Sequence, residues 1–169
     1  MPPIDITEQL RHKASRVRLL LMDCDGVLTD GRLYFGPAGE LMKAFDVRDG
    51  QGIATWHRSG YLCGVITGRP GEIVKARVDE LGIKYFKHSS ADKAADVREI
   101  LLHSGISNDE TAFVGDDIGD LPAFELVGLP IAVADAVDQV REAAGFVTSK
   151  HGGRGAIREV IDLLLASRS

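Results

Sequence analysis

Residues 19–30 read Leu19-Leu20-Leu21-Met22-Asp23-Cys24-Asp25-Gly26-Val27-Leu28-Thr29-Asp30, an apolar run that ends abruptly in two carboxylates and a glycine. The run is short enough for a buried strand, and the glycine marks a loop directly after it. Such a loop lies at the carboxyl end of its strand, where open α/β sheets bind their ligands. Because Asp23 and Asp25 would repel each other, a cation is expected to offset them; the alternative is that they only cap or turn the chain.

Length and composition indicate one globular domain, which we expect to span residues 1–169. The sequence is 44% hydrophobic and 27% charged, and no apolar run approaches the length of a membrane span. Its start lacks the basic-then-apolar pattern of a signal peptide, so a cytoplasmic location is the default expectation. The net charge of -5 gives no general electrostatic footprint for nucleic acid. Cys24 and Cys63 lack metal-binding spacing and are expected to be buried thiols in a reducing compartment.

Apolar runs alternate with polar, glycine-containing loops along the chain. The pattern predicts strands over residues 17–22, 61–66, 83–86, 111–114, 130–133 and 146–147, with a short hairpin at 32–35 and 41–45. It predicts helices over residues 4–16, 53–59, 73–81, 93–103, 121–127, 137–144 and 157–164, with a loop at 47–52 and Ser90 as the cap of the helix at 93–103. The expected fold is therefore α/β: a doubly wound, mostly parallel sheet with helices on both faces and a small β-hairpin insertion after the first strand.

Three loops at the expected carboxyl ends of parallel strands carry residues suited to phosphate chemistry. They contain Asp23 and Asp25, then Thr67 and Gly68, then Asp116, Asp117 and Asp120, while Lys93 begins a helix. Carboxylates from two separate loops make an oxygen-rich pocket of the kind that Mg²⁺ prefers, and the ion would offset their repulsion. Lys93, Thr67 and helix-terminal N–H groups could hold the oxygens of a phosphate. One aspartate could then attack phosphorus while a second protonates the leaving oxygen.

In order along the chain, these motifs resemble those of the haloacid dehalogenase superfamily of phosphohydrolases. The resemblance covers residues 23–30, the Thr67 loop, Lys93 and residues 115–120, and so spans nearly the whole chain. It implies that Asp23 is the nucleophile and that Asp25 is the general acid and base. It also implies that Thr67, Gly68 and Lys93 bind phosphate, and that Mg²⁺ is held by Asp116, Asp23 and the backbone carbonyl of Asp25. Asp117 and Asp120 would have auxiliary roles.

No large insertion separates the motifs, so no cap domain is expected to close over a small substrate. The hairpin at 32–45, the stretch 45–50 and the glycine-rich tail at 152–159 resemble the tetrameric 3-deoxy-D-manno-octulosonate 8-phosphate phosphatases of lipopolysaccharide synthesis. The resemblance implies a homotetramer in which the hairpin at 32–45 and the C-terminal glycine-rich tail at 151–169 make the oligomer contacts, and in which the tail reaches a neighbour's active site. Arg48 and Arg154 suit a phosphorylated sugar acid, because a guanidinium group matches the geometry of a carboxylate.

Three other functions remain open on the sequence. Related phosphatases of the same architecture act on nine-carbon sialic-type sugar 9-phosphates. The same fold occurs as a non-catalytic assembly module of sugar nucleotidyltransferases, although the complete set of phosphatase motifs disfavours this. The third is a phosphatase of broad specificity. His88 and His151 are expected to be ordinary loop histidines.

Overall fold

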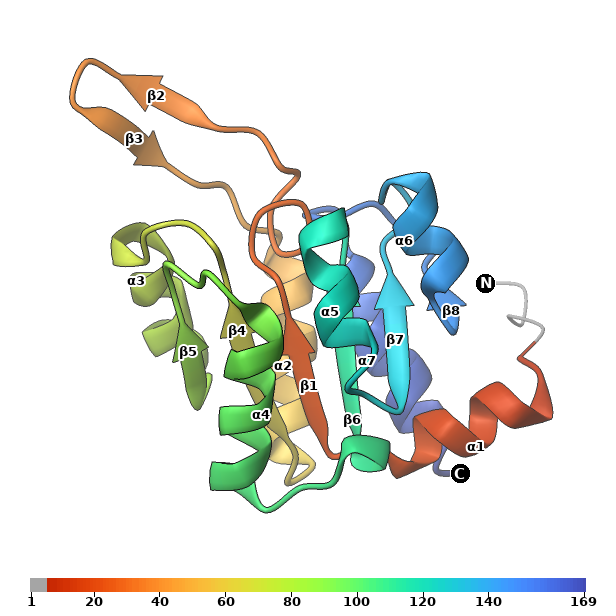
Figure 1. The fold of residues 1–169 in the computed structure, drawn as a ribbon. Coiled ribbons are helices and arrows are strands. Elements are labelled where there is room, and N and C mark those ends of the chain that lie inside the picture. The colour runs from red at the N-terminus through yellow and green to blue at the C-terminus, as the bar shows by residue number, and fades with distance from the viewer. Residues whose placement is uncertain (1–5) are drawn as a thin grey trace.

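Strand β1 (Leu19–Met22) is central in a six-stranded parallel sheet of order β5-β4-β1-β6-β7-β8 (Figure 1). The computed structural model describes residues 6–169. The chain adds two strands on one side of β1 and then returns to add three on the other side. The strand order therefore reverses between β1 and β6, and open α/β sheets bind ligands at such a reversal. The other strands are β4 (Leu62–Ile66), β5 (Tyr85–Lys87), β6 (Thr111–Gly115), β7 (Leu129–Ala132) and β8 (Phe146–Val147).

Helices cover both faces of the sheet, as the sequence predicts. Helices α2 (Val47–Arg58) and α7 (Ala156–Ala166) pack together on one face, and α4 (Lys93–Ser104) and α5 (Leu121–Phe124) on the other (Figure 1). None of the helices among the described residues is long and apolar enough to cross a membrane. The remaining helices are α1 (Glu8–Arg16), α3 (Glu72–Leu81) and α6 (Asp138–Ala143), with 3₁₀ turns at Asn108–Glu110 and Ile118–Asp120.

The core forms around β1, whose four residues are all fully buried. This strand pairs with β4 on one side and β6 on the other, so Leu19 lies opposite both Leu62 and Thr111. A strand that is covered on both faces needs a continuous apolar run rather than an alternating one, which explains residues 19–22. Trp56 of α2 is also fully buried, and its indole N–H donates to the Leu62 carbonyl oxygen at 2.9 Å. The largest side chain of the core therefore has its polar atom satisfied.

An antiparallel hairpin of β2 (Tyr34–Gly36) and β3 (Gly39–Met42) follows β1 and projects away from the sheet (Figure 1). These strands lie closer together in sequence than the predicted 32–35 and 41–45, because only residues 37–38 form the turn. The hairpin carries apolar surface that its own chain leaves open. Four of its large side chains are between 44% and 65% exposed: Leu33, Phe35, Leu41 and Met42.

Helix α2 begins at Val47, so the predicted loop at 47–52 is wrong. Asp46 caps the helix, because its carboxylate accepts a backbone N–H of the first turn at 2.7 Å. The glycines in this segment suggest a loop, but inside the helix they permit close packing. A Cβ atom on Gly52 would lie 3.2 Å from the Cα of Arg158 in α7. Close contact between α2 and α7 therefore overrides the helix-breaking tendency of glycine.

The other predicted boundaries agree with the structure to within three residues where both are described. Residues 4–5, part of the first predicted helix, lie outside the described residues. The predicted cap of α4 is wrong: Asp92 takes this position, and its carboxylate accepts the Ala95 N–H at 3.0 Å. Ser90 instead donates its hydroxyl to the Asp96 carboxylate.

Asp49 is a buried carboxylate where α2 meets α7. Its Oδ1 accepts the Arg158 N–H at 2.9 Å, whereas its Oδ2 is buried with no hydrogen-bond partner among the described residues. Burial raises the pKa of Asp49 from 3.8 to about 6. The charged form is therefore less favourable in the folded chain than in the unfolded chain.

We expect the wild type to lose stability relative to Asp49→Asn as the pH rises from about 4 to about 6. In this window the unfolded chain releases the Asp49 proton while the folded chain keeps it, so the free energy of unfolding falls. The pKa shift of Asp49 corresponds to roughly 2–3 kcal/mol in the free energy of unfolding, and this contribution is fully lost above the pKa of the folded state. Urea unfolding across this pH range measures the difference. Asp162→Asn, at an exposed position of α7, is the control, and identical pH profiles for wild type and Asp49→Asn would contradict the prediction.

Candidate active site

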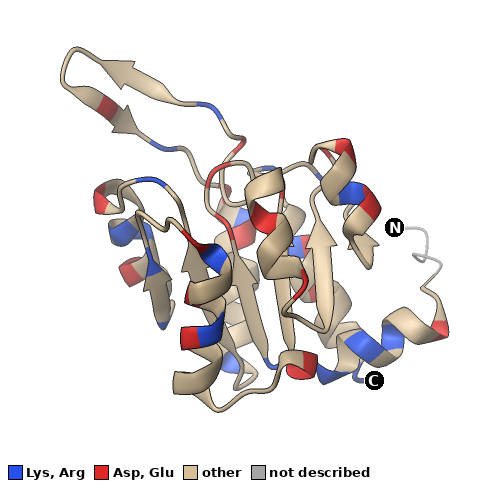
Figure 2. Ribbon diagram, viewed as in Figure 1, with Lys and Arg blue, Asp and Glu red and all other residues tan. Residues whose placement is uncertain are grey.

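The carboxyl ends of β1 and β6 place the two acidic loops side by side. Met22 pairs with Val114, and the Asp23 N–H donates to the Val114 carbonyl oxygen at 3.0 Å. Acidic and basic residues gather in the loops at this end of the sheet (Figure 2). A cleft of about 340 Å³ opens there, at the reversal of strand order. It is lined by Asp23, Asp25, Gly31, Thr67, Gly68, Arg69, Lys93, Asp116, Asp117, Gly119 and Asp120.

An acidic cluster occupies this cleft. Carboxylate oxygens of Asp23, Asp116 and Asp120 all lie within 4.8 Å of one another. Burial and the neighbouring carboxylates of Asp23 and Asp120 raise the pKa of Asp116 to about 8, and burial with the Asp120 charge raises that of Asp23 to about 6. Oδ1 of Asp116 is buried and has no hydrogen-bond partner among the described residues. A crowded set of carboxylates, in which Oδ1 of Asp116 lacks a donor, fits a hard divalent cation such as Mg²⁺, which would stabilise the charged forms.

Lys93 and Asp120 hold the cluster in place. The Lys93 ammonium lies 3.1 Å from Oδ1 of Asp23 and 2.6 Å from Oδ1 of Asp120. The other oxygen of Asp120 accepts the Asp116 N–H at 3.0 Å. Both oxygens of Asp120 are therefore engaged within the protein, which leaves Asp23 and Asp116 as the carboxylates available to a cation. The carboxylate of Asp117, which also lines the cleft, caps the 3₁₀ turn that follows by accepting the Ile118 N–H at 2.8 Å.

The loop after β1 depends on a glycine that contacts the acidic cluster. Gly26 has a φ of +85°, and a Cβ atom there would lie 1.9 Å from Oδ2 of Asp116. The glycine-rich tail packs onto the same loop, since a Cβ on Gly152 would lie 1.7 Å from the Gly26 carbonyl oxygen. The Gly153 N–H donates to the Val27 carbonyl oxygen at 2.9 Å. The first part of the tail thus lies against the active-site loop of its own chain.

Asp25 lines the cleft beside Asp23 and is held from the hairpin side. Its Oδ1 accepts a hydrogen bond from the Lys43 ammonium at 2.5 Å, and Lys43 also contacts Oε1 of Glu40 at 2.7 Å. Lys43 and Glu40 are not among the residues that the sequence motifs indicate. Nothing in their spacing reveals the contact, because it depends on how the folded chain places the base of the hairpin beside the loop after β1.

The loop after β4 supplies the opposite wall of the cleft. Thr67 is buried, its hydroxyl accepts the Arg69 N–H at 3.3 Å, and Gly68 lies between them at the surface. Arg69 lines the cleft, and its Nε is buried with no hydrogen-bond partner among the described residues. Arg69 is not among the residues predicted from the sequence, although its place directly after Thr67 and Gly68 could have indicated it.

Arg48 and Arg154 lie together, but in a second hollow outside the acidic cleft. One Nη of Arg48 lies 3.4 Å from the Arg154 carbonyl oxygen, and Arg154 pairs with Asp30 at 3.7 Å. The two hollows adjoin, because Asp30 lines one and Gly31 lines the other. The second, of about 330 Å³, is lined by Asp30, Arg32, Tyr34, Ala44, Phe45, Asp46, Arg48, Gly153 and Arg154.

Comparison with known proteins identifies the family. The family model of the haloacid dehalogenase-like hydrolases matches residues 83–161. The 3-deoxy-D-manno-octulosonate 8-phosphate phosphatase of Escherichia coli K12 is 44% identical over 92% of this chain and 83% of its own length. The chain belongs to the haloacid dehalogenase-like hydrolases. Within them it belongs to the family of that phosphatase.

Solved structures of this hydrolase family share the fold over nearly the whole chain. The crystal structure of the phosphatase from Yersinia pestis is 40% identical with a TM-score of 0.93, and the match covers 95% of this chain and 87% of that one. The phosphatase from Moraxella catarrhalis, in complex with magnesium ion, phosphate ion and KDO, is 36% identical with a TM-score of 0.90. That match covers 94% of this chain and 91% of the other. The predicted family and α/β fold are both confirmed.

The structure gathers most of the residues selected from sequence into the hydrolase cleft. Asp23, Asp25, Thr67, Gly68, Lys93 and Asp116 all line it, whereas Arg48 and Arg154 do not. His88 and His151 are exposed and line neither hollow. Which of these residues act in the reaction stays a prediction.

We expect Gly26→Ala to weaken divalent-cation binding at least about 10-fold, because the new methyl group displaces the Asp116 carboxylate. Titration calorimetry with Mg²⁺ measures the affinity. Gly60→Ala is the matched control: Gly60 has a φ of +87°, and its Cβ position has no neighbour within 4 Å. An equal loss of affinity in both variants would show that backbone strain, and not the Asp116 contact, is responsible.

Proposed function

We propose that this chain is a Mg²⁺-dependent phosphatase that hydrolyses 3-deoxy-D-manno-octulosonate 8-phosphate to the free sugar acid and inorganic phosphate. The observation that carries the proposal is the pairing of Asp23 and Asp116 beside Lys93, in a chain 44% identical to a phosphatase named for this substrate. The reaction would belong to lipopolysaccharide synthesis, as the resemblance of this chain to the phosphatases of that pathway implies.

In the first step Asp23 is the nucleophile. A carboxylate oxygen of Asp23 attacks phosphorus while the bond from phosphorus to the ester oxygen breaks, and the ester oxygen takes the bonding electron pair. Asp25 gives its proton to that oxygen, so the sugar acid leaves as an alcohol. The Lys93 ammonium, 3.1 Å from Asp23, is placed to balance the charge on the transferring phosphoryl group.

In the second step the aspartyl phosphate is hydrolysed. Water attacks phosphorus, Asp25 takes a proton from the water, and Asp23 leaves as a free carboxylate. Asp23, Asp116 and the Asp25 backbone carbonyl would hold Mg²⁺, which supplies charge neutralisation and fixes the orientation of the phosphate. Thr67 and Gly68 would bind the remaining phosphate oxygens from the opposite wall.

The sugar acid carries a carboxylate as well as a phosphate. Arg69 supplies a guanidinium within the cleft, and Arg48 and Arg154 supply two more in the adjoining hollow. A guanidinium group matches carboxylate geometry. We assign Arg48 and Arg154 to recognition of the substrate carboxylate, with the hairpin and tail of neighbouring subunits completing the site.

We further propose that the chain is a homotetramer in the cytoplasm. The four exposed apolar side chains of the hairpin support self-association, because a monomer would leave them in water. Both cysteines are free and buried, which is compatible with a reducing compartment.

We expect strong, Mg²⁺-dependent phosphate release from 3-deoxy-D-manno-octulosonate 8-phosphate, with less from a nine-carbon sialic-type 9-phosphate. EDTA abolishes the activity, and Asp23→Asn lowers kcat at least about 1,000-fold because it removes the nucleophile. Phosphate release is measured for both substrates, with Asp79→Asn, at an exposed position of α3, as the control. A preference for the nine-carbon compound would overturn the substrate, and activity that survives Asp23→Asn would overturn the mechanism. No metal-dependent release from any phosphomonoester would favour the assembly-module alternative.

We expect the double variant Phe35→Glu, Leu41→Glu to be a monomer, because charges at the hairpin oppose burial of its apolar surface. Size-exclusion chromatography with light scattering at micromolar concentration measures the mass. Leu102→Glu, which changes an 82% exposed leucine of α4, is the control and leaves the tetramer intact. A wild-type monomer would refute the proposed assembly.

A further inference from the structure

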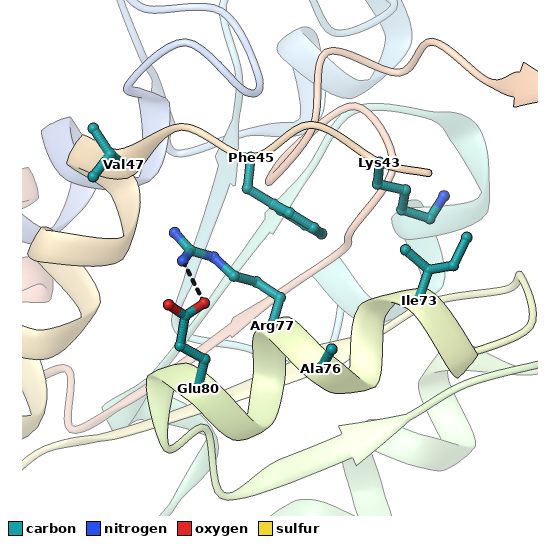
Figure 3. A pocket seen from close by; sticks show the side chains of 7 residues that line it. All are labelled: Lys43, Phe45, Val47, Ile73, Ala76, Arg77 and Glu80. Carbon is teal, nitrogen blue, oxygen red and sulfur yellow. Dashed lines mark hydrogen bonds and ion pairs between the residues drawn. The ribbon is translucent and has the colours of Figure 1, made fainter. Parts of the chain in front are cut away.

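Lys43 reaches from the segment after β3 into the active site. Its ammonium contacts Oδ1 of Asp25 and Oε1 of Glu40, at 2.5 and 2.7 Å. The Lys43 side chain has no exposed surface, although Lys43 also borders a shallow pocket beside α3. Figure 3 shows its amine turned away from Arg77 and Glu80 of that pocket. A buried ammonium group needs compensating charge, and here both of its partners are carboxylates.

This contact makes the two oxygens of Asp25 unequal. Oδ1 is held by Lys43, whereas Oδ2 is buried without a hydrogen-bond partner among the described residues. The terminal torsion of an aspartate side chain is soft, so the carboxylate plane needs an external partner to fix it. Because the two oxygens rotate together, holding Oδ1 also fixes the position of Oδ2.

The contact also ties the hairpin to both walls of the cleft. The second oxygen of Glu40 lies 3.6 Å from the Arg69 guanidinium, which lies 5.8 Å from the centre of the Phe35 ring. Charges of alternating sign therefore run from Asp25 through Lys43 and Glu40 to Arg69. Such a network holds its members in one arrangement more firmly than a single pair does.

We infer that Lys43 is a positioning residue for the general acid and base, an inference that rests on the proposed function. By holding Oδ1 of Asp25, it fixes the plane of the carboxyl group that serves the reaction. The Asp25 carboxyl gives its proton to the ester oxygen as that oxygen takes the electron pair of the breaking bond to phosphorus. In the second step the Asp25 carboxylate takes a proton from the attacking water. Lys43 itself touches neither the substrate nor the transferred proton.

The test compares two leaving groups in Lys43→Met, which removes the ammonium and keeps a long, linear side chain. For 3-deoxy-D-manno-octulosonate 8-phosphate, whose leaving oxygen needs a proton, kcat falls about 10- to 100-fold while KM changes less than about 3-fold. The burst of nitrophenolate from 4-nitrophenyl phosphate slows less than about 3-fold, because this leaving group departs without a proton.

Two further variants connect the effect to Asp25. In an Asp25→Asn background, Lys43→Met causes no additional loss, because the group that it positions is already removed. Lys43→Arg keeps a charged donor and recovers part of the activity. Lys75→Met is the matched control, since it removes a lysine paired with Asp79 on the exposed face of α3 and leaves both substrates unaffected.

Each other outcome overturns one of the two proposals. An equal loss on both leaving groups, or a full additional loss in the Asp25→Asn background, would overturn the inference about Lys43. Wild type without metal-dependent phosphate release would overturn the proposed function instead. If Lys43→Met does not fold, Glu40→Gln takes its place, because it weakens the second contact of Lys43. We expect Glu40→Gln to slow the reaction of the sugar-acid phosphate more than the burst from 4-nitrophenyl phosphate, by a smaller factor than Lys43→Met. No contrast in that variant would also overturn the inference.

Discussion

Repulsion between carboxylates is the constraint on which this site depends. Asp23 and Asp116 follow neighbouring strands, and the parallel pairing of β1 with β6 leaves them no room to separate. Isolated negative charges in a buried place are costly, so the site needs positive charge from Lys93 and from a cation. The carboxylates therefore require a cation even when no substrate is bound. A phosphoryl group in transfer also requires positive charge nearby, since its negative charge spreads over several oxygens.

The hairpin is an insertion in the topology, but residues at its base contact the active site. It adds no strand to the main sheet, and its outer surface is apolar. Its base nevertheless carries Lys43 and Glu40, which reach Asp25 and Arg69 on opposite sides of the cleft. If its outer surface holds neighbouring subunits, as proposed, then assembly and the orientation of Asp25 share one structural element. A chain without a cap domain would in this way order its active site through its neighbours.

Much of the fold follows from the sequence because burial patterns are local. The continuous apolar run at 19–22 indicates a fully covered strand, and the acidic loops after β1 and β6 indicate where the sheet binds its ligand. Gly52 of α2 could not be interpreted this way, because its reason is the approach of α7, which lies more than one hundred residues away along the chain. The role of Lys43 could not be predicted either, because its contact with Asp25 forms only in the folded chain. A lysine beside a hairpin is usually solvated, and only the folded hairpin shows that this one is buried.

The contact between Gly152 and Gly26 has a consequence for how the protein is made. The tail and the loop after β1 approach so closely that only hydrogen atoms fit between them, and the tail donates an N–H to that loop. The loop leaves the ribosome more than one hundred residues before the tail. The nascent chain can build most of its sheet in that interval, but the loop that carries Asp23 and Asp25 receives this support only once the tail has been made. A chain that stops before Gly152 would therefore lack the support of this loop.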